Sequence, residues 1–484
     1  MTEERRSACN MNDFDVAIVG AGPAGLFAAI ELVKTGSGKL NIALIDKGFK
    51  VEKRICPITV KREKSLVSNN DRSINCQACP ICHIMYGIGG AGTLSSGIIN
   101  LRPDVGGDLD KLLGDWMKAE ELINYIDKLF MEFGAPEDSL IVPNDKKSRI
   151  IERLAAKAGA KYIPTPQRVL GTDVMVKVIS NITGFLEKNE VKIMEGTDVK
   201  DLKKENGQIK LITDKGEIFA KKVLLAPGRG GARWFHDLAQ KIGIDIEPGP
   251  LDIGVRVEIP YYITEHITSI NHDPKIVMYT KFYDDKVRTF CTNPHGFVLK
   301  EYYDDGTVGV NGETYKNLKS KNTNFALLVT LKLTDPYSDV LEFGKSIAKM
   351  ATKVGMGKPI VQRVGDLEKG RRSTWERIGR SVITPTLKSV TPGDISLILP
   401  YRVVSNILEA LSRLEEVYPG VSSPQTLLYA PEIKYYGVKA KVTPSLETNI
   451  DNIYVAGDGA GLSRGINVAA STGVIAARAI LGIL

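Results

Sequence analysis

The chain has 484 residues, of which 43% are hydrophobic and 25% charged, and its formal net charge is +7. This length predicts two or three domains, and the ordinary composition excludes a disordered, collagen-like or small disulfide-rich protein. The lysines are scattered along the chain, which favours a solvated surface and predicts no nucleic-acid partner. The polar N-terminus has no secretory signal, so we expect a cytoplasmic protein.

A nucleotide-binding turn is predicted near the N-terminus. Residues 16–19 form an apolar strand, residues 23–34 an apolar helix, and residues 41–45 a second strand that ends at Asp46. The glycines at Gly-x-Gly-x-x-Gly spacing between the first strand and the helix are Gly20, Gly22 and Gly25. Such glycines let a pyrophosphate approach the backbone at the helix N-terminus, and Asp46 would accept a hydrogen bond from a ribose hydroxyl.

A cysteine-rich segment follows the second strand and runs into the glycine loop "GIGGAG". Its cysteines are Cys56, Cys76, Cys79 and Cys82. Three cysteines spaced two apart resemble an iron–sulfur run, with Cys56 as the fourth thiolate, and predict a [4Fe–4S] cluster. A redox-active thiol or disulfide set, a zinc site and unligated core cysteines remain as alternatives. The segment lacks charges, but its glycines and cysteines are not typical of a membrane span, and none is expected.

The middle of the chain alternates between helical and strand-like patterns. Apolar residues at helical spacing predict a helical insertion over residues 103–161, and residues 162–248 return to the first domain. Residues 249–436 read as a mixed α+β domain, with antiparallel strands around 254–259, 275–283 and 287–303.

The C-terminal segment repeats the strand–turn–helix pattern. Its strand begins near residue 453 and ends in "AGDGAG", which places Asp458 at the carboxyl end of the strand. A helix of small residues starts near Ile466, so its positive N-terminus would face a bound cofactor. Residues 437–484 therefore complete the domain that residues 13–102 begin.

These motifs resemble those of the flavoproteins with two dinucleotide-binding domains, the glutathione-reductase and fumarate-reductase group. Residues 221–234 resemble its "ATG" element, with Pro227 in place of Thr, and residues 191–202 resemble the strand that meets the adenine through Val199. "GIGGAGTLSSGIINLRPDVGG", "VRTFCTNPHGFV" and "LYAPEIKYYG" further resemble an uncharacterised FAD-dependent dehydrogenase family of this superfamily. The resemblance implies an α/β fold, in which a discontinuous Rossmann-like FAD-binding domain carries an inserted mixed α+β cap or substrate domain.

Spacing and resemblance together predict a set of FAD contacts and a small set of catalytic candidates. The predicted contacts are Gly20, Gly22, Pro23, Ala24, Gly25, Asp46, Lys47, Arg54, Gly90, Ala91, Gly92, Thr93, Val199, Pro227, Gly228, Gly457, Asp458, Gly465, Ile466 and Asn467. The catalytic candidates are Cys291, His295 and Arg464. Arg464 would anchor an anionic substrate or bind phosphate.

The leading hypothesis is an FAD-dependent oxidoreductase that acts on a small organic substrate, with the cysteine cluster relaying electrons to the flavin. No second Gly-x-Gly-x-x-Gly follows a strand elsewhere, so a ferredoxin-like or NAD(P)H electron donor is expected to dock transiently. Two alternatives remain: a FAD-linked thiol–disulfide reductase that uses the cysteines directly, and a flavoprotein that serves as a binding or scaffold subunit.

Overall fold

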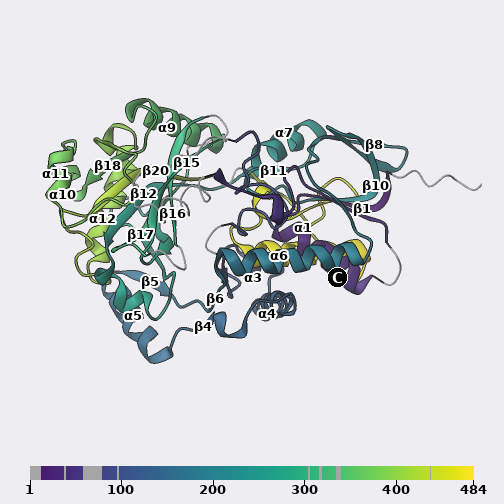
Figure 1. Cartoon of the computed structure of the whole chain (residues 1–484), viewed down its shortest axis with the longest axis horizontal. Helices are drawn as coiled ribbons and strands as arrows, with labels where there is room; N and C mark the ends of the chain where they lie inside the picture. The colour runs from purple at the N-terminus through teal and green to yellow at the C-terminus, as the bar shows by residue number, and fades with distance from the viewer. Residues whose placement is uncertain are drawn as a thin grey trace, which may run out of the picture.

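The computed structural model describes residues 12–36, 40–57, 79–94, 97–303, 306–314, 319–333, 339–435 and 438–484. Two lobes lie side by side (Figure 1). Purple and yellow segments, from the two ends of the chain, share the right-hand lobe, while the green middle of the chain forms the left-hand lobe. The predicted fold class, a discontinuous dinucleotide-binding domain with an inserted mixed domain, is confirmed.

The first lobe is built on a seven-stranded sheet in the order β7-β2-β1-β10-β9-β8, with β22 paired to β10. Its strands are β1 (Asp13–Val19), β2 (Ile42–Ile45), β7 (Lys192–Met194), β8 (Val199–Glu205), β9 (Gln208–Thr213), β10 (Gly216–Leu225) and β22 (Ile453–Val455). The strands β7, β2, β1, β10 and β22 pair in parallel. Because parallel strands end at one edge, the turns after β1, β2, β10 and β22 meet there.

Helices from distant parts of the sequence cover this sheet. They are α1 (Pro23–Thr35), α4 (Trp116–Glu132), α6 (Gly171–Lys188), α7 (Ala232–Ile242) and α13 (Ile466–Leu481). The helices α1 and α13 pack very closely, since a Cβ on Gly473 would lie 2.0 Å from the carbonyl oxygen of Ala24. The short α3 (Leu109–Leu113) ends at Gly114, whose φ of +64° separates it from α4.

The second lobe, here called the cap, contains an eight-stranded sheet in the order β19-β18-β20-β12-β17-β14-β13-β5. Its strands are β5 (Ala160–Ile163), β12 (Leu251–Pro260), β13 (Lys275–Tyr279), β14 (Lys286–Asn293), β17 (Asn322–Leu331), β18 (Ile360–Arg363), β19 (Thr391–Pro392) and β20 (Leu427–Tyr435). The helices α9 (Val340–Val354) and α12 (Tyr401–Leu414) pack on this sheet and share its core.

One segment lies differently from the expected helical insertion. The helix α5 (Asp145–Lys157) and strand β5 join the cap, where β5 pairs antiparallel with β13. The apolar face of α5 explains this placement, because Ile151 and Ala155 are buried in the cap core.

Shorter elements complete the two lobes. The remaining strands are β3 (Ile98–Asn100), β4 (Leu140–Ile141), β6 (Gln167–Val169), β11 (Ile246–Pro248), β15 (Phe297–Tyr302), β16 (Val308–Glu313) and β21 (Val438–Ala440). The remaining α-helices are α8 (Glu265–Thr268), α10 (Val364–Leu367) and α11 (Trp375–Gly379). Within the described part of the chain, no helix combines the length and apolar character needed to cross a membrane.

Candidate functional site

The turn after β1 is shaped by glycines that leave no room for a side chain. Gly20 has a φ of +101°, and a Cβ there would lie 2.0 Å from the carbonyl oxygen of Ala226 at the end of β10. A Cβ on Gly25 would lie 1.9 Å from the carbonyl oxygen of Gly20, so α1 packs directly onto the turn. Pro23 starts α1 without an acidic residue in its first turn, which leaves the positive helix N-terminus open to an anion.

Asp46, at the end of β2, organises the loops of this edge. Its carboxylate accepts hydrogen bonds from the backbone N–H groups of Ala21 at 2.9 Å, Gly48 at 2.7 Å and Gly87 at 2.9 Å. Charge-assisted bonds of this kind are stronger than neutral ones. Asp46 thus joins the glycine turn to the loop that follows the cysteine segment, a role beyond the predicted contact with a ribose.

Arg54 fixes the same loop, the glycine loop after the cysteine segment, through hydrogen bonds to its backbone. It is buried, and its guanidinium donates to the backbone carbonyls of His83, Ile84, Ile88 and Gly90 at 2.8–3.0 Å. Burial lowers the pKa of Arg54 to about 10, while the nearby charge of Asp46 opposes that shift. Arg54 therefore positions the glycine loop through its backbone.

The C-terminal turn contributes a second helix N-terminus. Asp458 follows β22 after Gly457, and one of its carboxylate oxygens lies 3.4 Å from Nε of Arg229. The helix α13 starts at Ile466 with no acidic residue in its first turn. Asn467 in that turn is buried, and its Oδ1 has no hydrogen-bond partner among the described residues.

A cavity of about 320 Å³ lies between the turns of the first lobe and the cap. The predicted FAD contacts that line it are Gly20, Gly22, Pro23, Ala24, Asp46, Gly90, Ala91, Gly92, Pro227, Gly228, Gly457, Asp458, Gly465 and Ile466. The predicted contacts outside its wall are Gly25, Lys47, Arg54, Thr93, Val199 and Asn467. Lys47 contacts a residue of the wall, because its Nζ lies 3.5 Å from the ring centre of Tyr86, which lines the cavity.

The cap closes the other side of the cavity with charged side chains. Alternate residues of a strand share one face, and Lys286, Arg288 and Phe290 of β14 all line the cavity. Lys275 lines it from the neighbouring β13, and Arg464 lines it from the loop before α13. Sequence reasoning found Arg464 but missed the β14 cations. Their position on either side of the buried Val287 was the available signal.

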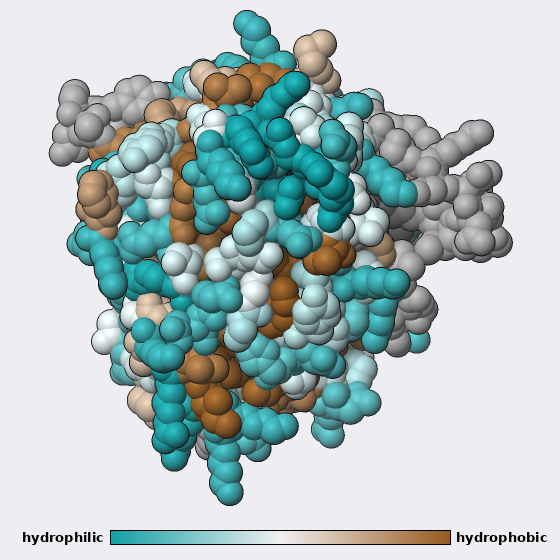
Figure 2. All heavy atoms as spheres, turned by 90° about the vertical axis from the view of Figure 1, so that its left-hand side faces the viewer, coloured by the Kyte–Doolittle hydropathy of each residue, from teal (hydrophilic) through white to brown (hydrophobic). Residues whose placement is uncertain are grey.

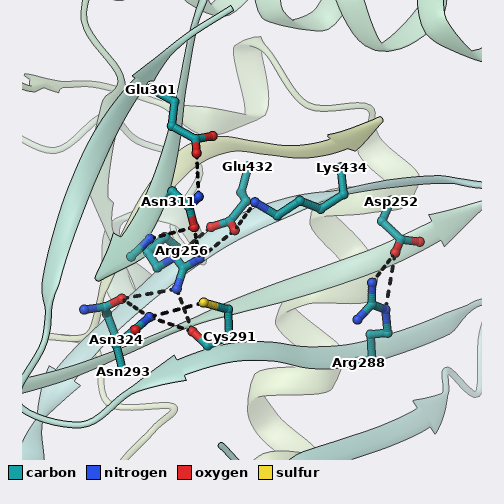
Figure 3. Close-up of polar contacts among 11 residues, drawn as sticks. Asp252, Arg256, Arg288, Cys291, Asn293, Glu301, Asn311, Asn324, Glu432 and Lys434 are labelled. Carbon is teal, nitrogen blue, oxygen red and sulfur yellow. Dashed lines mark hydrogen bonds and ion pairs between the residues drawn. The ribbon is translucent and has the colours of Figure 1, made fainter. Parts of the chain in front are cut away.

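Arg288 is held in place by Asp252 of β12. Its Nη2 and Nε lie 2.6 Å and 3.2 Å from one carboxylate oxygen of Asp252, which is almost fully buried (Figure 3). Burial alone would raise the pKa of Asp252, but Arg288 and Thr330 outweigh it and the pKa is lowered. The carboxylate therefore stays ionised and fixes the guanidinium at the cavity wall.

Cys291 also lines the cavity, at an irregular point of β14. Its φ is +48°, which is unusual for a residue with a side chain. Its carbonyl accepts hydrogen bonds from Nη1 of Arg256 at 2.9 Å and Nδ2 of Asn293 at 2.7 Å (Figure 3). The backbone at the predicted catalytic thiol is thus fixed by a buried network.

The centre of that network is an ion pair between Arg256 and Glu432, both fully buried. The guanidinium donates to the two carboxylate oxygens at 2.6 Å and 2.7 Å, and Nζ of Lys434 lies 3.0 Å from one of them (Figure 3). Burial alone would raise the pKa of Glu432, but Arg256 and Lys434 reverse that effect and lower it.

His295, the second predicted catalytic residue, lies outside the cavity wall. Its ring stacks on Tyr261 with ring centres 3.6 Å apart, and its Nδ1 lies 2.9 Å from the carbonyl oxygen of Ser320. Its surroundings therefore indicate a packing role within the cap.

The predicted metal ligands are only partly covered by the structure. Cys76 lies outside the described residues, while Cys56, Cys79 and Cys82 are half-buried and do not line the cavity. Among the described residues, no three His, Cys, Asp or Glu side chains are arranged to hold a metal ion. The described cysteines thus give no support to the expected iron–sulfur centre.

Residues 250–434 match the family model described as "FAD-dependent protein, C-terminal domain-like". This range coincides with most of the cap, and the match confirms the prediction of an FAD-dependent protein. An uncharacterised protein of Clostridium beijerinckii is 25% identical over 96% of this chain and 80% of its own length.

Similar solved structures include L-proline dehydrogenase from P. horikoshii, with 13% identity, coverage of 97% of this chain and 93% of that chain, and a TM-score of 0.42. Another is 3-ketosteroid-Δ4-(5α)-dehydrogenase from Rhodococcus jostii RHA1, with 11% identity, 97% coverage of each chain and a TM-score of 0.41. These likenesses are too distant to indicate a substrate.

Proposed function

We propose that this FAD-dependent oxidoreductase oxidises or reduces a small organic substrate held between its two lobes. The observation that carries the proposal is a single cavity with two unlike walls. One wall is made of glycine turns and two helix N-termini, and the other is made of charged cap side chains. The first suits a dinucleotide cofactor and the second a polar substrate.

The residues of the first wall fit FAD. Gly22 and Gly90 approach each other closely, since a Cβ on Gly90 would lie 3.0 Å from Cα of Gly22, and both line the cavity. Phosphates can therefore reach the main-chain N–H groups at the start of α1. Asn467 lies outside this wall, in the first turn of α13, and its buried Oδ1 has no hydrogen-bond partner among the described residues. FAD, when bound, supplies a ring that takes up or gives up electrons and a proton.

The chain's own residues bind and orient the reactants. Asp46 and Arg54 fix the glycine loop, and Asp252 fixes Arg288 on the opposite wall. A substrate held by the β14 cations would be presented to the first wall, with Phe290 excluding water beside it. Such positioning is worth several orders of magnitude in rate because the reactants meet in a fixed geometry.

An external electron donor completes this proposal. The cap sheet is largely antiparallel and gives no second dinucleotide-binding turn among the described residues. We therefore propose that NAD(P)H or a ferredoxin-like protein docks transiently. Anaerobic mixing with each donor, followed by the loss of the flavin absorbance, distinguishes the two.

An iron–sulfur relay remains a second proposal, supported by the Cys-x2-Cys-x2-Cys spacing directly before the loop that lines the cavity. The described cysteines form no ligand set, so we assign no step to a cluster. Iron and acid-labile sulfide in anaerobically purified protein test the relay. Full flavin content without iron would exclude it.

A scaffold role is less well supported. Figure 2 shows the outer side of the cap lobe, where apolar side chains form patches separated by hydrophilic ones. A face of this kind is ordinary for a monomer and does not indicate a large obligate interface.

The absorbance spectrum of the purified protein tests the proposed function. We expect one FAD per chain, bleaching on anaerobic reduction and recovery with an electron acceptor. Protein that contains no flavin and takes up none during incubation with FAD would contradict the proposal.

A further inference from the structure

The cap wall of the cavity gathers more positive side chains than the cofactor wall opposite. Lys286 and Arg288 project from one face of β14 and Lys275 lies on β13, while Arg464 lines the same cavity from the first lobe, in the loop before α13. Two of these cations have carboxylate partners, since Arg288 binds Asp252 and Lys275 binds Asp273. Lys286 forms no such ion pair among the described residues, although the carboxylate of Asp108 in the cavity wall lies near enough to feel its charge.

Lys286 is the clearest case. It is half-buried, and no hydrogen bond or ion pair within the described part of the chain involves its ammonium group. Burial lowers its pKa, and the positive charges of Arg288 and Arg464 lower it further, against the weaker opposing effects of Asp252 and Asp108. An anion that enters the cavity would therefore stabilise the protonated, charged form of this lysine.

The surroundings of Arg464 place its charge on the same side. Its backbone N–H donates to the carbonyl of Gly106 at 2.7 Å, which fixes the loop beside the cavity. The side chains that feel its charge include Lys286, Asp252 and Asp108. Arg464 thus lies close enough to Lys286 for its charge to add to that of the cap cations.

We propose that Lys286, Arg288 and Arg464 form an anion-binding subsite that takes the carboxylate of an organic-acid substrate. This inference rests on the proposed function, because the subsite matters to catalysis only if a cofactor occupies the opposite wall. Phe290 and Val277 line the cavity beside the cations, so the body of the acid meets an apolar surface. Arginine and lysine together give both a directional fork and a mobile point charge for a carboxylate.

Benzoate and its neutral analogue benzamide are suitable probes, because they share a shape and differ in charge. Their binding to FAD-loaded protein is measured by calorimetry and by the change in flavin absorbance. The test variant is Lys286→Gln. The matched control is Lys281→Gln, which removes an exposed lysine from the turn between the same two strands, outside the cavity wall.

We expect benzoate to bind and benzamide to bind at least about tenfold more weakly, since one charged hydrogen bond accounts for a difference of that size. Lys286→Gln should weaken benzoate binding by about tenfold and leave benzamide binding and FAD content unchanged. Lys281→Gln should behave like the unaltered protein. Equal affinities for the two probes, or unchanged benzoate affinity in Lys286→Gln, would overturn the proposal.

The FAD content separates this inference from the one on which it rests. Loss of FAD in Lys286→Gln would assign the lysine to the cofactor phosphates and overturn the subsite. Protein that never binds FAD would contradict the proposed function, while calorimetry would still show whether benzoate depends on Lys286. Protein that binds FAD but not benzoate would contradict the subsite alone.

Discussion

The two walls of the cavity are made by different means. The dinucleotide wall consists of main chain, with Gly20 and Gly90 leaving space and the N-termini of α1 and α13 supplying positive potential. The cap wall consists of long charged side chains backed by buried ion pairs such as that of Arg256 and Glu432. The spacing of glycines within a short segment determines a wall made of main chain. A wall made of side chains forms only when strands that are distant in the sequence pack together.

The largest expected effect comes from breaking the buried ion pair that backs the cap wall. Arg256→Met leaves the fully buried Glu432 with only Lys434 as a charged partner, and we expect a loss of about 3–5 kcal/mol of unfolding free energy. Arg380→Met is the control, because its ion pair with Glu376 is exposed and contributes at most about 1 kcal/mol. Chemical denaturation measures both, and equal losses would show that burial of the pair is unimportant.

The sequence predicted the dinucleotide wall well, because each element of this wall is specified within one short stretch of chain. The helix expected over residues 23–34 is observed as Pro23–Thr35, and the helix expected near Ile466 begins there. Glycine spacing and a period of 3.6 residues specify such elements within one stretch of chain. Asp46 was found by its position, although its three bonds to backbone N–H groups were not foreseen.

The cap wall could not be predicted in the same way. Its strands were expected, but the pairing of β5 with β13 joins residues more than a hundred positions apart, and no local pattern specifies it. The alternation around Lys286 and Arg288 indicates a shared strand face. This alternation does not show that the shared face lies opposite the dinucleotide wall, because that arrangement depends on how the two lobes pack.

A second prediction tests the main-chain character of the dinucleotide wall. Gly20→Ala places a methyl group 2.0 Å from the carbonyl oxygen of Ala226 and requires a φ of +101°. We expect about 2–4 kcal/mol of destabilisation and loss of bound FAD, from overpacking and backbone strain together. Gly184→Ala is the control, because nothing lies within 4 Å of its Cβ and alanine favours helix α6. Flavin retention after gel filtration measures the difference, and a fully loaded Gly20→Ala protein would contradict this account.

A third prediction concerns Asp46, an acidic side chain that joins loops of that wall. Asp46→Asn keeps the shape but leaves one carbonyl oxygen where the carboxylate accepts three backbone N–H groups. We expect about 1–3 kcal/mol weaker FAD binding, since charged acceptors lose this much when neutralised. Asp15→Asn at the other end of β1, where the carboxylate accepts from the N–H of Asn41, should leave FAD affinity unchanged. Fluorescence titration of the apoprotein with FAD measures both, and equal affinities would remove Asp46 from the site.

The smallest expected effect is a pH dependence confined to the cap wall. The protonated form of Lys286 binds the anion, and the pKa of this lysine is lowered by burial and by Arg288 and Arg464. Benzoate affinity should therefore fall as the pH rises, beginning below the value of about 10.4 at which ordinary lysines titrate. The other lysine of the cavity wall, Lys275, is paired with Asp273. Asp252 and Asp108 have lowered pKa values and stay ionised, and arginines remain charged.

The slope of that profile identifies the group that titrates. Calorimetry across neutral to alkaline pH should show the decline in the unaltered protein and in Lys281→Gln. The decline should be much smaller in Lys286→Gln, because glutamine has no proton to lose. A decline that persists undiminished in Lys286→Gln would show that another group controls anion binding. Side chains other than Lys286 and Arg288 would then be responsible for the pH dependence of anion binding at the cap wall.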